Sequence, residues 1–305
     1  MANWLKRNFL KRKIDNYIRN KVNEELENNF KNYQLSYEWK NALFNKILFL
    51  DKSIGSELKI RCYLDSMISK LIFIEKFEQK ELIFLHNFLR PGDVFIDIGA
   101  NIGLHTLIAS KKVEANGKVY AFEPTPNTFA RLKENIYINN IQNVEIFPIA
   151  LSNTSGSQPF FSFGNGMDAF NSFAPILEQT PFEKVDVATT TLSNFYSKLP
   201  VGLIEKISLI KIDVEGWEAP VLEGGYKLLE KPNAPTLLVE FTEENAKAAG
   251  RKCSDLFSLG EELGYKWYHI ENNKIIESRK KKYFPYQNLI ASKDKFALLD
   301  RIQIQ

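Results

Sequence analysis

Short apolar runs alternate with amphipathic stretches along most of this chain. The runs contain few charged residues and end at a turn residue or an acid, which is typical of strands buried in a parallel sheet. The stretches between them repeat their apolar residues with the period of a helix. The pattern predicts five such strands: Val94–Ile98, Val119–Phe122, Val144–Ala150, Leu209–Val214 and Thr236–Phe241. Strands that alternate with helices in this way predict an α/β fold with a mostly parallel, Rossmann-like sheet.

The C-terminal part of the chain carries a different pattern after the last of these strands. A helix is expected over Ser254–Leu263, and Tyr265–Ile276 predicts a hairpin around Asn272-Asn273. Asn288–Ser292 predicts a last strand. An antiparallel end strand on the sheet fits this order of elements.

The first 70 residues predict an N-terminal helical extension. Apolar residues recur at helical spacing between Leu5 and Leu26, and a helical or mixed pattern continues over residues 34–60. A strand-like start at Leu71 then joins an amphipathic helix that ends near Leu89. We therefore expect the extension over residues 1–70 and the Rossmann-like domain over residues 71–305.

Composition limits the class of protein. With 305 residues, 44% of them hydrophobic, and 23 Phe, the chain can bury a sizeable core in one large domain with an extension. Cys62 and Cys253 are too few for a disulfide framework, which fits a reducing compartment. Neither Cys nor His shows a zinc spacing, and no apolar run is long enough for a membrane span or a signal peptide. The expected location is the cytoplasm.

Charge is distributed unevenly along the chain. The net charge is +3, but residues 1–22 hold seven Lys or Arg against one Asp, so the rest of the chain sums to −3. A protein that binds nucleic acid usually carries basic residues across its fold, so we expect no nucleic-acid partner. The basic N-terminal helix has two interpretations: peripheral contact with an anionic membrane or a partner, or packing on its own domain or on a second subunit. We favour packing.

The most informative stretch is the βαβ unit from Val94 to Glu123. Gly99 and Gly103 let the chain turn sharply and come close to a ligand. Glu123 follows Gly103 by 20 residues and stands at the end of the second strand, where an acid accepts hydrogen bonds from both hydroxyls of a ribose. This arrangement predicts a site for an adenosine-containing ligand.

The detail of the turn separates two kinds of ligand. A dinucleotide site uses G-x-G-x-x-G, whereas this turn is G-x-x-x-G with Ala100 and Asn101 in its gap. Asp97 would repel a pyrophosphate and attract a cationic sulfonium or ammonium. We infer S-adenosylmethionine as the ligand. The plain alternative is a tight strand-to-helix turn with a capping Asn.

A second stretch, Ser208–Leu222, supplies acids at the same edge of the sheet. Asp213 and Glu215 are two residues apart, so they point to one side while the strand continues. Together they can orient a hydroxyl group and accept its proton, or hold a divalent ion. The alternative is that Asp213 caps the next helix and Glu215 is solvated. Glu240, near the end of the next strand, is a further acid at this edge.

The third strand and the segment after it are candidate walls of the site. Ile149, Ala150 and Leu151 end the third strand, where adenine binds in this architecture; they fit the protein core equally well. Residues 152–183 form a long polar excursion with six Phe. Such an excursion is either a lid or binding loop, or a β-hairpin that uses its rings for packing. Val185–Leu192 predicts a strand after it.

Four motifs resemble one known family in their order and spacing. They are FIDIGANIGLHT, KVYAFEPTPNTFARLKENI, LIKIDVEGWEAPVLEGG and LLVEF, and they resemble the FkbM-type methyltransferases over about residues 90–265. The first two are common among class I methyltransferases, whereas KIDVEG-x-E is far more specific to this family. The resemblance implies the seven-stranded class I fold, S-adenosylmethionine as cofactor, and O-methyl transfer to a sugar of a surface polysaccharide or to a secondary metabolite.

The resemblance and the residue pattern together give the expected site. The cofactor-binding residues are Asp97, Gly99, Ala100, Asn101, Gly103, Glu123, Pro124, Ala150, Leu151 and Asp213. The catalytic candidates are Asp213, as acceptor of the hydroxyl proton, Glu215, Glu240 and His105. His105 stands where the family more often has an aromatic such as Tyr; we favour a simple replacement over an active role. No metal is expected, but Asp213 and Glu215 are the ligands if one is used.

Three rival functions are less well supported by the sequence. A nicotinamide-dependent oxidoreductase needs the middle glycine that this turn lacks. An RNA base methyltransferase typically carries N/D-P-P-[YF] after the fourth strand, whereas this chain has Asp213-Val-Glu-Gly. A degenerate scaffold would have little reason to keep Asp97, Gly99, Gly103 and Glu123 together. The expected partner is a small-molecule or saccharide acceptor.

Overall fold

A computed structural model of the chain describes residues 28–163, 166–168, 171–174, 181–271 and 274–302. Its centre is an eight-stranded sheet in the order β12-β11-β13-β10-β9-β3-β4-β5. Five strands are parallel: β3 (Val94–Ile98), β4 (Lys118–Phe122), β5 (Val144–Phe147), β9 (Ile207–Ile212) and β10 (Thr236–Thr242). Three antiparallel pairings close one edge: β13 (Tyr286–Ser292) on β10, β11 (Lys266–Glu271) on β13, and β12 (Lys274–Glu277) on β11. The expected mostly parallel sheet with an antiparallel end is confirmed.

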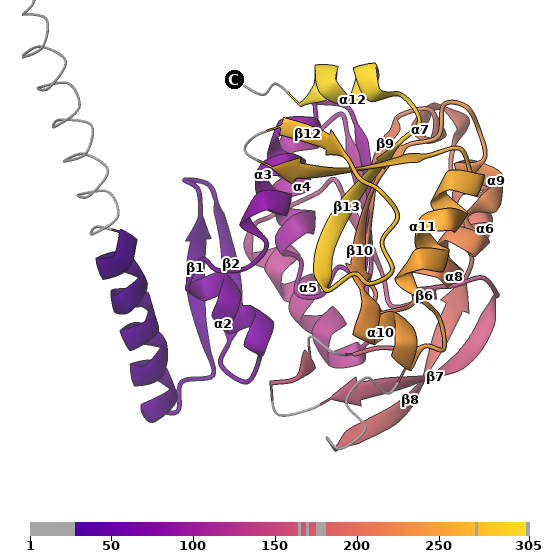
Figure 1. Cartoon of the computed structure of the whole chain (residues 1–305). Helices are drawn as coiled ribbons and strands as arrows, with labels where there is room; N and C mark the ends of the chain where they lie inside the picture. The colour runs from indigo at the N-terminus through magenta and orange to yellow at the C-terminus, as the bar shows by residue number, and fades with distance from the viewer. Residues whose placement is uncertain (1–27, 164–165, 169–170, 175–180, 272–273, 303–305) are drawn as a thin grey trace, which may run out of the picture.

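Helices cover both faces of this sheet (Figure 1). One face packs against α3 (Gln79–Phe88), α4 (Leu104–Val113) and α12 (Lys295–Arg301). The other packs against α6 (Leu192–Tyr196), α8 (Glu218–Gly224), α9 (Tyr226–Leu229) and α11 (Cys253–Glu262). Every residue of β3 is buried because its side chains alternate between two covered faces. Two further short helices are α7 (Val201–Ile204) and α10 (Glu243–Ala248).

The strand order reverses between β3 and β9. From β3 the chain adds β4 and β5 on one side, and β9 and β10 then follow on the other. In an open parallel sheet the loops at such a reversal diverge, which leaves a crevice at the carboxyl ends of the two strands. The turns after β3 and β9 therefore meet at the place where a ligand is expected.

The N-terminal segment is less helical than the sequence pattern predicted. A helix ends at residue 44, and a hairpin of β1 (Phe49–Ile54) and β2 (Leu58–Tyr63) follows it. The expected helical extension is therefore wrong over residues 49–63, because Leu58, Ile60 and Cys62 alternate inward with the period of a strand. The basic helix expected over residues 1–22 lies outside the described residues.

Other boundaries also differ from the predictions. The strand-like start at Leu71 is instead the end of α2 (Met67–Phe73), a helix capped by the Ser66 side chain. The expected strand Val144–Ala150 stops before Pro148, which has no N–H to donate, and β6 (Ala150–Leu151) pairs with another sheet. The segment after the acids at the end of β9 forms two helices, α8 and α9, which meet at Gly225.

The long excursion supplies the first strand of a β-hairpin, and the second strand begins at its end. β7 (Gly156–Phe163) pairs with β8 (Phe182–Thr190), and β6 completes a three-stranded sheet. The rings of Phe161 and Phe182 lie 5.0 Å apart between centroids, so this part uses its aromatics for packing. Phe170 and the turn residues Asn272-Asn273 lie outside the described residues.

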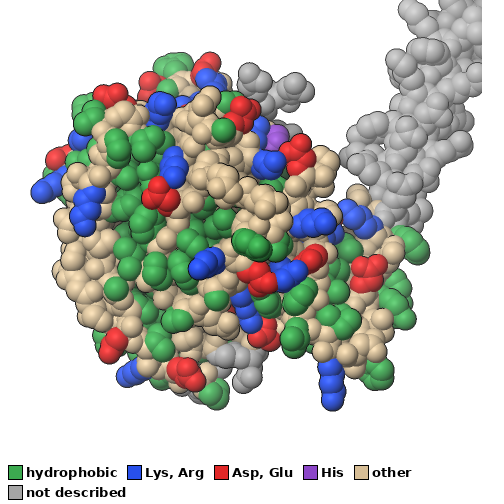
Figure 2. Space-filling model, turned by 180° about the vertical axis from the view of Figure 1, so that it is seen from behind, with side chains coloured by type: hydrophobic (Ala, Val, Ile, Leu, Met, Phe, Trp, Pro, Cys, Tyr) green, Lys and Arg blue, Asp and Glu red, His purple; other side chains and the backbone are tan. Residues whose placement is uncertain are grey.

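The surface of the described residues carries both positive and negative side chains. On the face shown in Figure 2, basic and acidic side chains are interspersed. The outer side of the helix over residues 28–44 exposes large apolar rings, among them Phe30, Tyr33 and Phe44. Within the described residues, none of the helices has the length and apolar character that crossing a bilayer requires.

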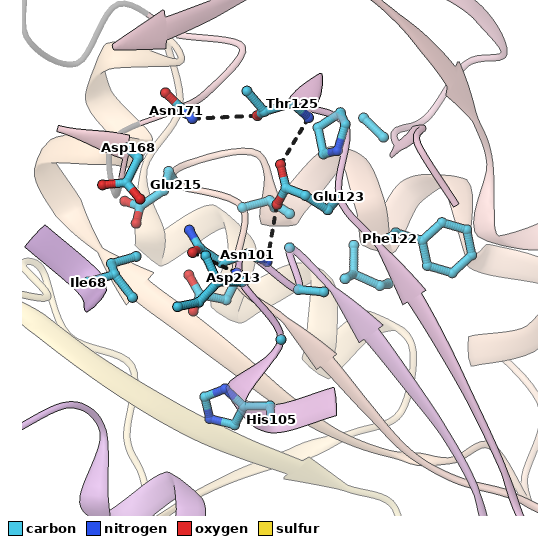
Figure 3. Close-up of a pocket in the computed structure, with 18 of the residues that line it drawn as sticks. Ile68, Asn101, His105, Phe122, Glu123, Thr125, Asp168, Asn171, Asp213 and Glu215 are labelled. Carbon is cyan, nitrogen blue, oxygen red and sulfur yellow. Dashed lines mark hydrogen bonds between the residues drawn. The ribbon is translucent and has the colours of Figure 1, made fainter. Parts of the chain in front are cut away.

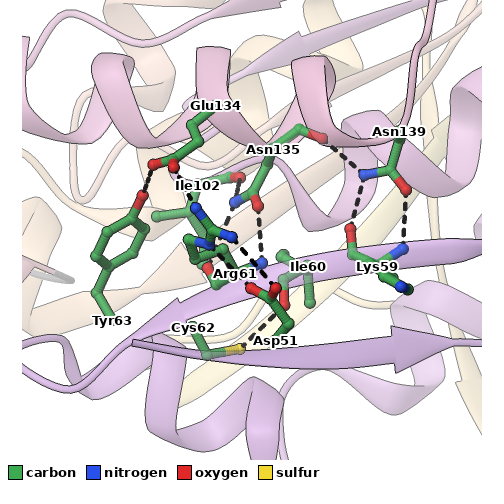
Figure 4. A network of polar contacts seen from close by, with 10 residues as sticks. All are labelled: Asp51, Lys59, Ile60, Arg61, Cys62, Tyr63, Ile102, Glu134, Asn135 and Asn139. Carbon is green, nitrogen blue, oxygen red and sulfur yellow. Dashed lines mark hydrogen bonds and ion pairs between the residues drawn. The ribbon is translucent and has the colours of Figure 1, made fainter. Parts of the chain in front are cut away.

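Two amides fasten the N-terminal hairpin to the helix α5 (Pro126–Ile138) and its end (Figure 4). Asn135 is fully buried; its Oδ1 accepts from the Arg61 N–H at 2.7 Å and its Nδ2 donates to the Ile102 carbonyl at 2.9 Å. Asn139 makes the corresponding pair of bonds with the backbone of Lys59. One side chain thus joins β2, α5 and the turn after β3.

We predict that Asn135→Ala destabilises the protein by about 2–4 kcal/mol, because it leaves buried backbone groups of β2 and of the turn without partners. Chemical denaturation measures this loss. The control is Gln142→Ala, which removes an exposed amide shortly after α5. It should change stability by less than about 0.5 kcal/mol. Equal effects of the two substitutions would show that the buried amide does not hold the hairpin.

Candidate active site

A pocket lies at the carboxyl ends of β3, β4 and β9 (Figure 3). The turn after β3 forms its floor, the end of β4 and the turn after β9 form two sides, and α2 and the excursion close it. Nine of the ten residues expected to bind the cofactor line it: Gly99, Ala100, Asn101, Gly103, Glu123, Pro124, Ala150, Leu151 and Asp213. Of the expected catalytic residues, His105, Asp213 and Glu215 line it and Glu240 does not.

Both glycines of the turn lie where the backbone angle and the close neighbours disfavour a side chain. Gly99 has φ +83°, and a Cβ built on it would lie 1.8 Å from the carbonyl oxygen of Asp213. Gly103 has φ +97°, and its Cβ would meet the Leu132 side chain at 2.5 Å. The N–H groups of Gly99 and Ala100 both donate to the carbonyl of Phe122, which ties the turn to the end of β4. The turn can approach the residue after β9 this closely only because Gly99 has no side chain.

Glu123 joins the two loops that would enclose a ribose. Its Oε2 accepts from the Asn101 N–H at 3.1 Å and its Oε1 accepts from the Thr125 N–H at 2.9 Å. Burial raises the pKa of Glu123 to about 7, against the effect of these donors. Each carboxylate oxygen has a second lone pair, so both can still accept a hydroxyl. The residues present therefore fit a ribose.

Asp97 and Lys211 form a buried pair of opposite charges, in which Lys211 lines the pocket and Asp97 does not. They are register partners on β3 and β9, and both side chains are almost completely buried. Asp97 Oδ2 accepts from the Thr106 hydroxyl at 2.6 Å, and its Oδ1 has no hydrogen-bond partner among the described residues. Lys211 Nζ donates to Asp213 Oδ2 at 2.7 Å. Burial lowers the pKa of Lys211, but Asp213, Glu78 and Asp97 outweigh it and hold that pKa above its usual value.

The acids after β9 do not continue the strand. β9 ends at Ile212, so the expectation of a strand through Val214 is wrong, and Glu215 adopts φ +52° in the turn. The alternative roles for these acids, Asp213 as a helix cap and Glu215 as a solvated side chain, are wrong as well. Glu218, rather than Asp213, accepts from the N–H groups of Val214 and Gly216, and Glu215 is part-buried with its Oε2 accepting from Asn245 Nδ2 at 2.5 Å.

The strand ends gather more negative than positive charge. Burial raises the pKa of Glu215 and of Glu240 well above their usual values, and the charge of Asp213 adds to both effects. Glu240 lies behind the pocket, where its Oε1 accepts from the Thr242 hydroxyl at 3.0 Å. One carboxylate oxygen each of Asp213, Glu215 and Glu240 lies within 4.8 Å of the other two. The three acids are thus one cluster.

His105 stands at the start of α4 with little exposure. Its Nε2 lies 3.2 Å from Glu78 Oε2, and its ring meets the edge of Phe77. Burial lowers the pKa of His105 well below its usual value, and Lys211 acts in the same direction. The imidazole is therefore neutral.

The adenine wall and the excursion contribute residues of two kinds. Ile149, Ala150 and Leu151 line the pocket, and the last two also belong to buried apolar clusters. Among the rings of the excursion, Phe160 and Phe173 line the pocket. The lid and packing interpretations therefore each describe part of the excursion.

Several lining residues were not expected from the sequence. Lys211 has a visible signal, a single cation inside an apolar strand. Asp168 and Asn171, from the excursion, and Ile68 and Ile72, from α2, have none. Asp168 Oδ2 accepts from the Ser66 hydroxyl at 2.7 Å, which links the excursion to the N-terminal segment.

Comparison with known sequences identifies a domain. A sequence model described as "Methyltransferase FkbM domain" matches residues 97–267, which is more than half of the chain. The match includes the glycine turn, Glu123 and all three acids of the cluster. It starts after the N-terminal hairpin.

Several characterised or named proteins are similar over about half of this chain. The hexuronic acid methyltransferase AglP of Haloferax volcanii is 31% identical over 158 residues, covering 51% of this chain and 59% of that protein. The 31-O-demethyl-FK506 methyltransferase FkbM of Streptomyces tacrolimicus is 31% identical, covering 45% and 60%. The 2-O-methyltransferase NoeI of Sinorhizobium fredii is 29% identical, covering 47% and 61%. The matched region spans about three fifths of each of these relatives.

Solved structures show weaker likeness. An S-adenosylmethionine-dependent O-methyltransferase from Thermotoga maritima is 13% identical with a TM-score of 0.39, covering 83% of this chain and 80% of that one. A putative methyltransferase from Streptococcus mutans in complex with S-adenosylhomocysteine is 14% identical with a TM-score of 0.40, covering 70% and 95%.

We predict that Gly99→Ala destabilises the protein far more than Gly92→Ala. Both glycines have φ near +85°, which costs an alanine about 1–2 kcal/mol, but a Cβ on Gly92 meets nothing within 4 Å. Gly99→Ala must also push the Asp213 backbone away. Denaturant unfolding of the two variants measures the difference, and equal losses would contradict the close approach of the two turns.

Proposed function

Since the chain belongs to the FkbM family of methyltransferases, we propose that it transfers the methyl group of S-adenosylmethionine to a hydroxyl group of a saccharide or a secondary metabolite. The observation that carries the proposal is that Glu123 and Asp213 line one pocket from two sides of the glycine turn. Glu123 suits a ribose, and Asp213 suits the reacting end of the cofactor. The names of the relatives, which include a hexuronic acid and 31-O- and 2-O- positions, support oxygen as the acceptor atom.

The cofactor would occupy the turn after β3. Glu123 accepts the two ribose hydroxyls, and Gly99, Ala100, Asn101 and Gly103 bring bare backbone close to the ligand. Pro124, Ala150 and Leu151 supply apolar walls for the adenosine. Asp97, which does not line the pocket, would act on the cationic part of the ligand only through its charge.

S-adenosylmethionine supplies a methyl group on a positively charged sulfur, and the chain's own residues position the acceptor and take its proton. A lone pair of the acceptor oxygen forms the new C–O bond as the C–S bond breaks and its electrons pass to sulfur. Asp213 accepts the hydroxyl proton, which leaves a methyl ether and S-adenosylhomocysteine. Lys211 orients Asp213 through one oxygen and leaves the other for the hydroxyl. Glu215 and neutral His105 lie beside this point and orient the acceptor.

The first test is the affinity for S-adenosylhomocysteine against that for NAD by calorimetry. We predict binding of the first alone, and tighter binding as the pH rises from about 6 to 8. The sign follows from Glu123, whose pKa of about 7 means that protons occupy it below neutrality, whereas ribose hydroxyls bind its ionised form.

Glu123→Gln is the control for this pH dependence, because the pKa of Glu218 is also raised to about 7 by burial. The variant should bind more weakly and with a flatter pH profile. A wild-type affinity that does not change with pH would show that Glu123 is not the ribose acceptor.

The second test concerns Asp213. We predict that Asp213→Ala and Asp213→Asn each lower turnover by about 100-fold or more while the affinity for S-adenosylhomocysteine changes little. Asp213→Asn retains an oxygen that accepts the hydrogen bond from Lys211, and so separates proton transfer from the loss of that hydrogen bond. Asp255→Ala, on the exposed side of α11, is the matched control. An equal loss of cofactor affinity would make Asp213 a cofactor ligand instead.

A further inference from the structure

The acid cluster at the ends of β9 and β10 holds more negative charge than its neighbours balance. Asp213, Glu215, Glu218 and Glu240 act on one another there, and the described residues supply Lys211 as the cation in contact with them. Bound S-adenosylmethionine would add a net charge of +1, from one sulfonium, one ammonium and one carboxylate. Carboxylates at this density in a buried place need either protons or a further cation.

Three of these acids share one pattern of hydrogen bonds. One oxygen of each is held by a protein donor: Asp213 Oδ2 by Lys211, Glu215 Oε2 by Asn245, and Glu240 Oε1 by Thr242. The second oxygen of each accepts no hydrogen bond within the part of the chain that the structure describes. For Glu240, 96% buried, that oxygen is also shielded from solvent and remains without a partner. Donors thus orient three carboxylates and leave one oxygen of each available.

Glu218 does not share this pattern. Its Oε1 accepts from two backbone N–H groups and holds the turn that carries Glu215. Gly216 keeps that turn against α10, since a Cβ there would lie 2.4 Å from the Asn245 carbonyl oxygen. The turn and Asn245 therefore fix the direction of Glu215 before any ligand arrives.

We propose that Asp213, Glu215 and Glu240 bind a divalent cation that prefers oxygen ligands, of the class of Mg²⁺, Mn²⁺ and Ca²⁺. Three carboxylates without Cys or His are the ligand set of such ions. Oxygens on opposite sides of Ca²⁺ are about 4.6–5.2 Å apart, and of Mg²⁺ about 4.2 Å. The observed spread of up to 4.8 Å accepts the larger ion as it stands and the smaller after a slight inward movement.

This site would narrow the class of acceptor, and in that respect it rests on the proposed function. Asp213 and Glu215 line the pocket while Glu240 lies behind them, so the open positions of the ion face the pocket. An ion there would occupy the oxygen of Asp213 that otherwise accepts the hydroxyl proton. It would take hydroxyl oxygens as further ligands and make a bound hydroxyl more acidic, so the proton would leave more easily without that acceptor. Acceptors with two neighbouring hydroxyls, as in a sugar ring, fit such an ion best.

The experiment measures metal binding without activity. The full chain is stripped with a chelator, and Mn²⁺ is titrated while the free ion is followed by electron paramagnetic resonance, with Mg²⁺ and Ca²⁺ as competitors. We expect one saturable site per chain. Glu240→Gln and Glu215→Gln should each weaken it by at least about tenfold. At the same Mn²⁺ concentration, the ion should raise the Tm of the wild type more than that of Glu240→Gln.

Glu244→Gln is the matched control, since it removes the same charge from an exposed acid four residues from Glu240. It should bind Mn²⁺ as the wild type does, and circular dichroism checks that each variant is folded. Absence of saturable binding in the wild type, or unchanged binding in both cluster variants, overturns the proposal. S-adenosylhomocysteine is titrated on the same metal-free samples, so loss of the metal site and failure of the proposed function give different results.

Discussion

The close approach of two backbone turns is the constraint on which the site depends. The turn after β3 touches the turn after β9 at Gly99, where the carbonyl of Asp213 occupies the space of a side chain. The first turn carries the groups that suit an adenosine, and the second carries the acids that suit a reacting hydroxyl. A side chain between them would separate the two halves of the pocket. Because Gly99 has no Cβ, the turn that suits the adenosine can lie directly against the turn that carries the acids.

Charge at this contact is arranged around Lys211. This ammonium is buried between Asp97 on the neighbouring strand and Asp213 at its own strand's end. A buried lysine is costly unless it is paired, and its partners here come from two parts of the pocket. The same residue thus stabilises the acid behind the glycine turn and orients the acid in front of it. Loss of either aspartate therefore changes the electrostatic environment of the other through Lys211.

Sequence patterns predicted the parallel strands, the glycine turn, Glu123 and the acids after β9, because each has a local signature. Short apolar runs indicated the strands, and residue type indicated the turns. Features that depend on distant partners were not predictable in this way. Lys211 acquires its role only beside Asp97, and Asn135 only beside Arg61 and Ile102. The hairpin over residues 49–63 was missed because its alternation is short and a helical pattern precedes it.

The N-terminal hairpin shares its apolar core with the glycine turn and the start of α4. Trp39, Leu58, Ile60 and Cys62 belong to the same buried cluster as Ile102, Leu104 and Leu107. The region that matches the family, residues 97–267, therefore lacks part of the apolar core against which its own glycine turn packs. A boundary drawn at residue 70 would cut through a shared core and expose the underside of the glycine turn. The family match and the packed core thus have different boundaries, and the core includes the hairpin.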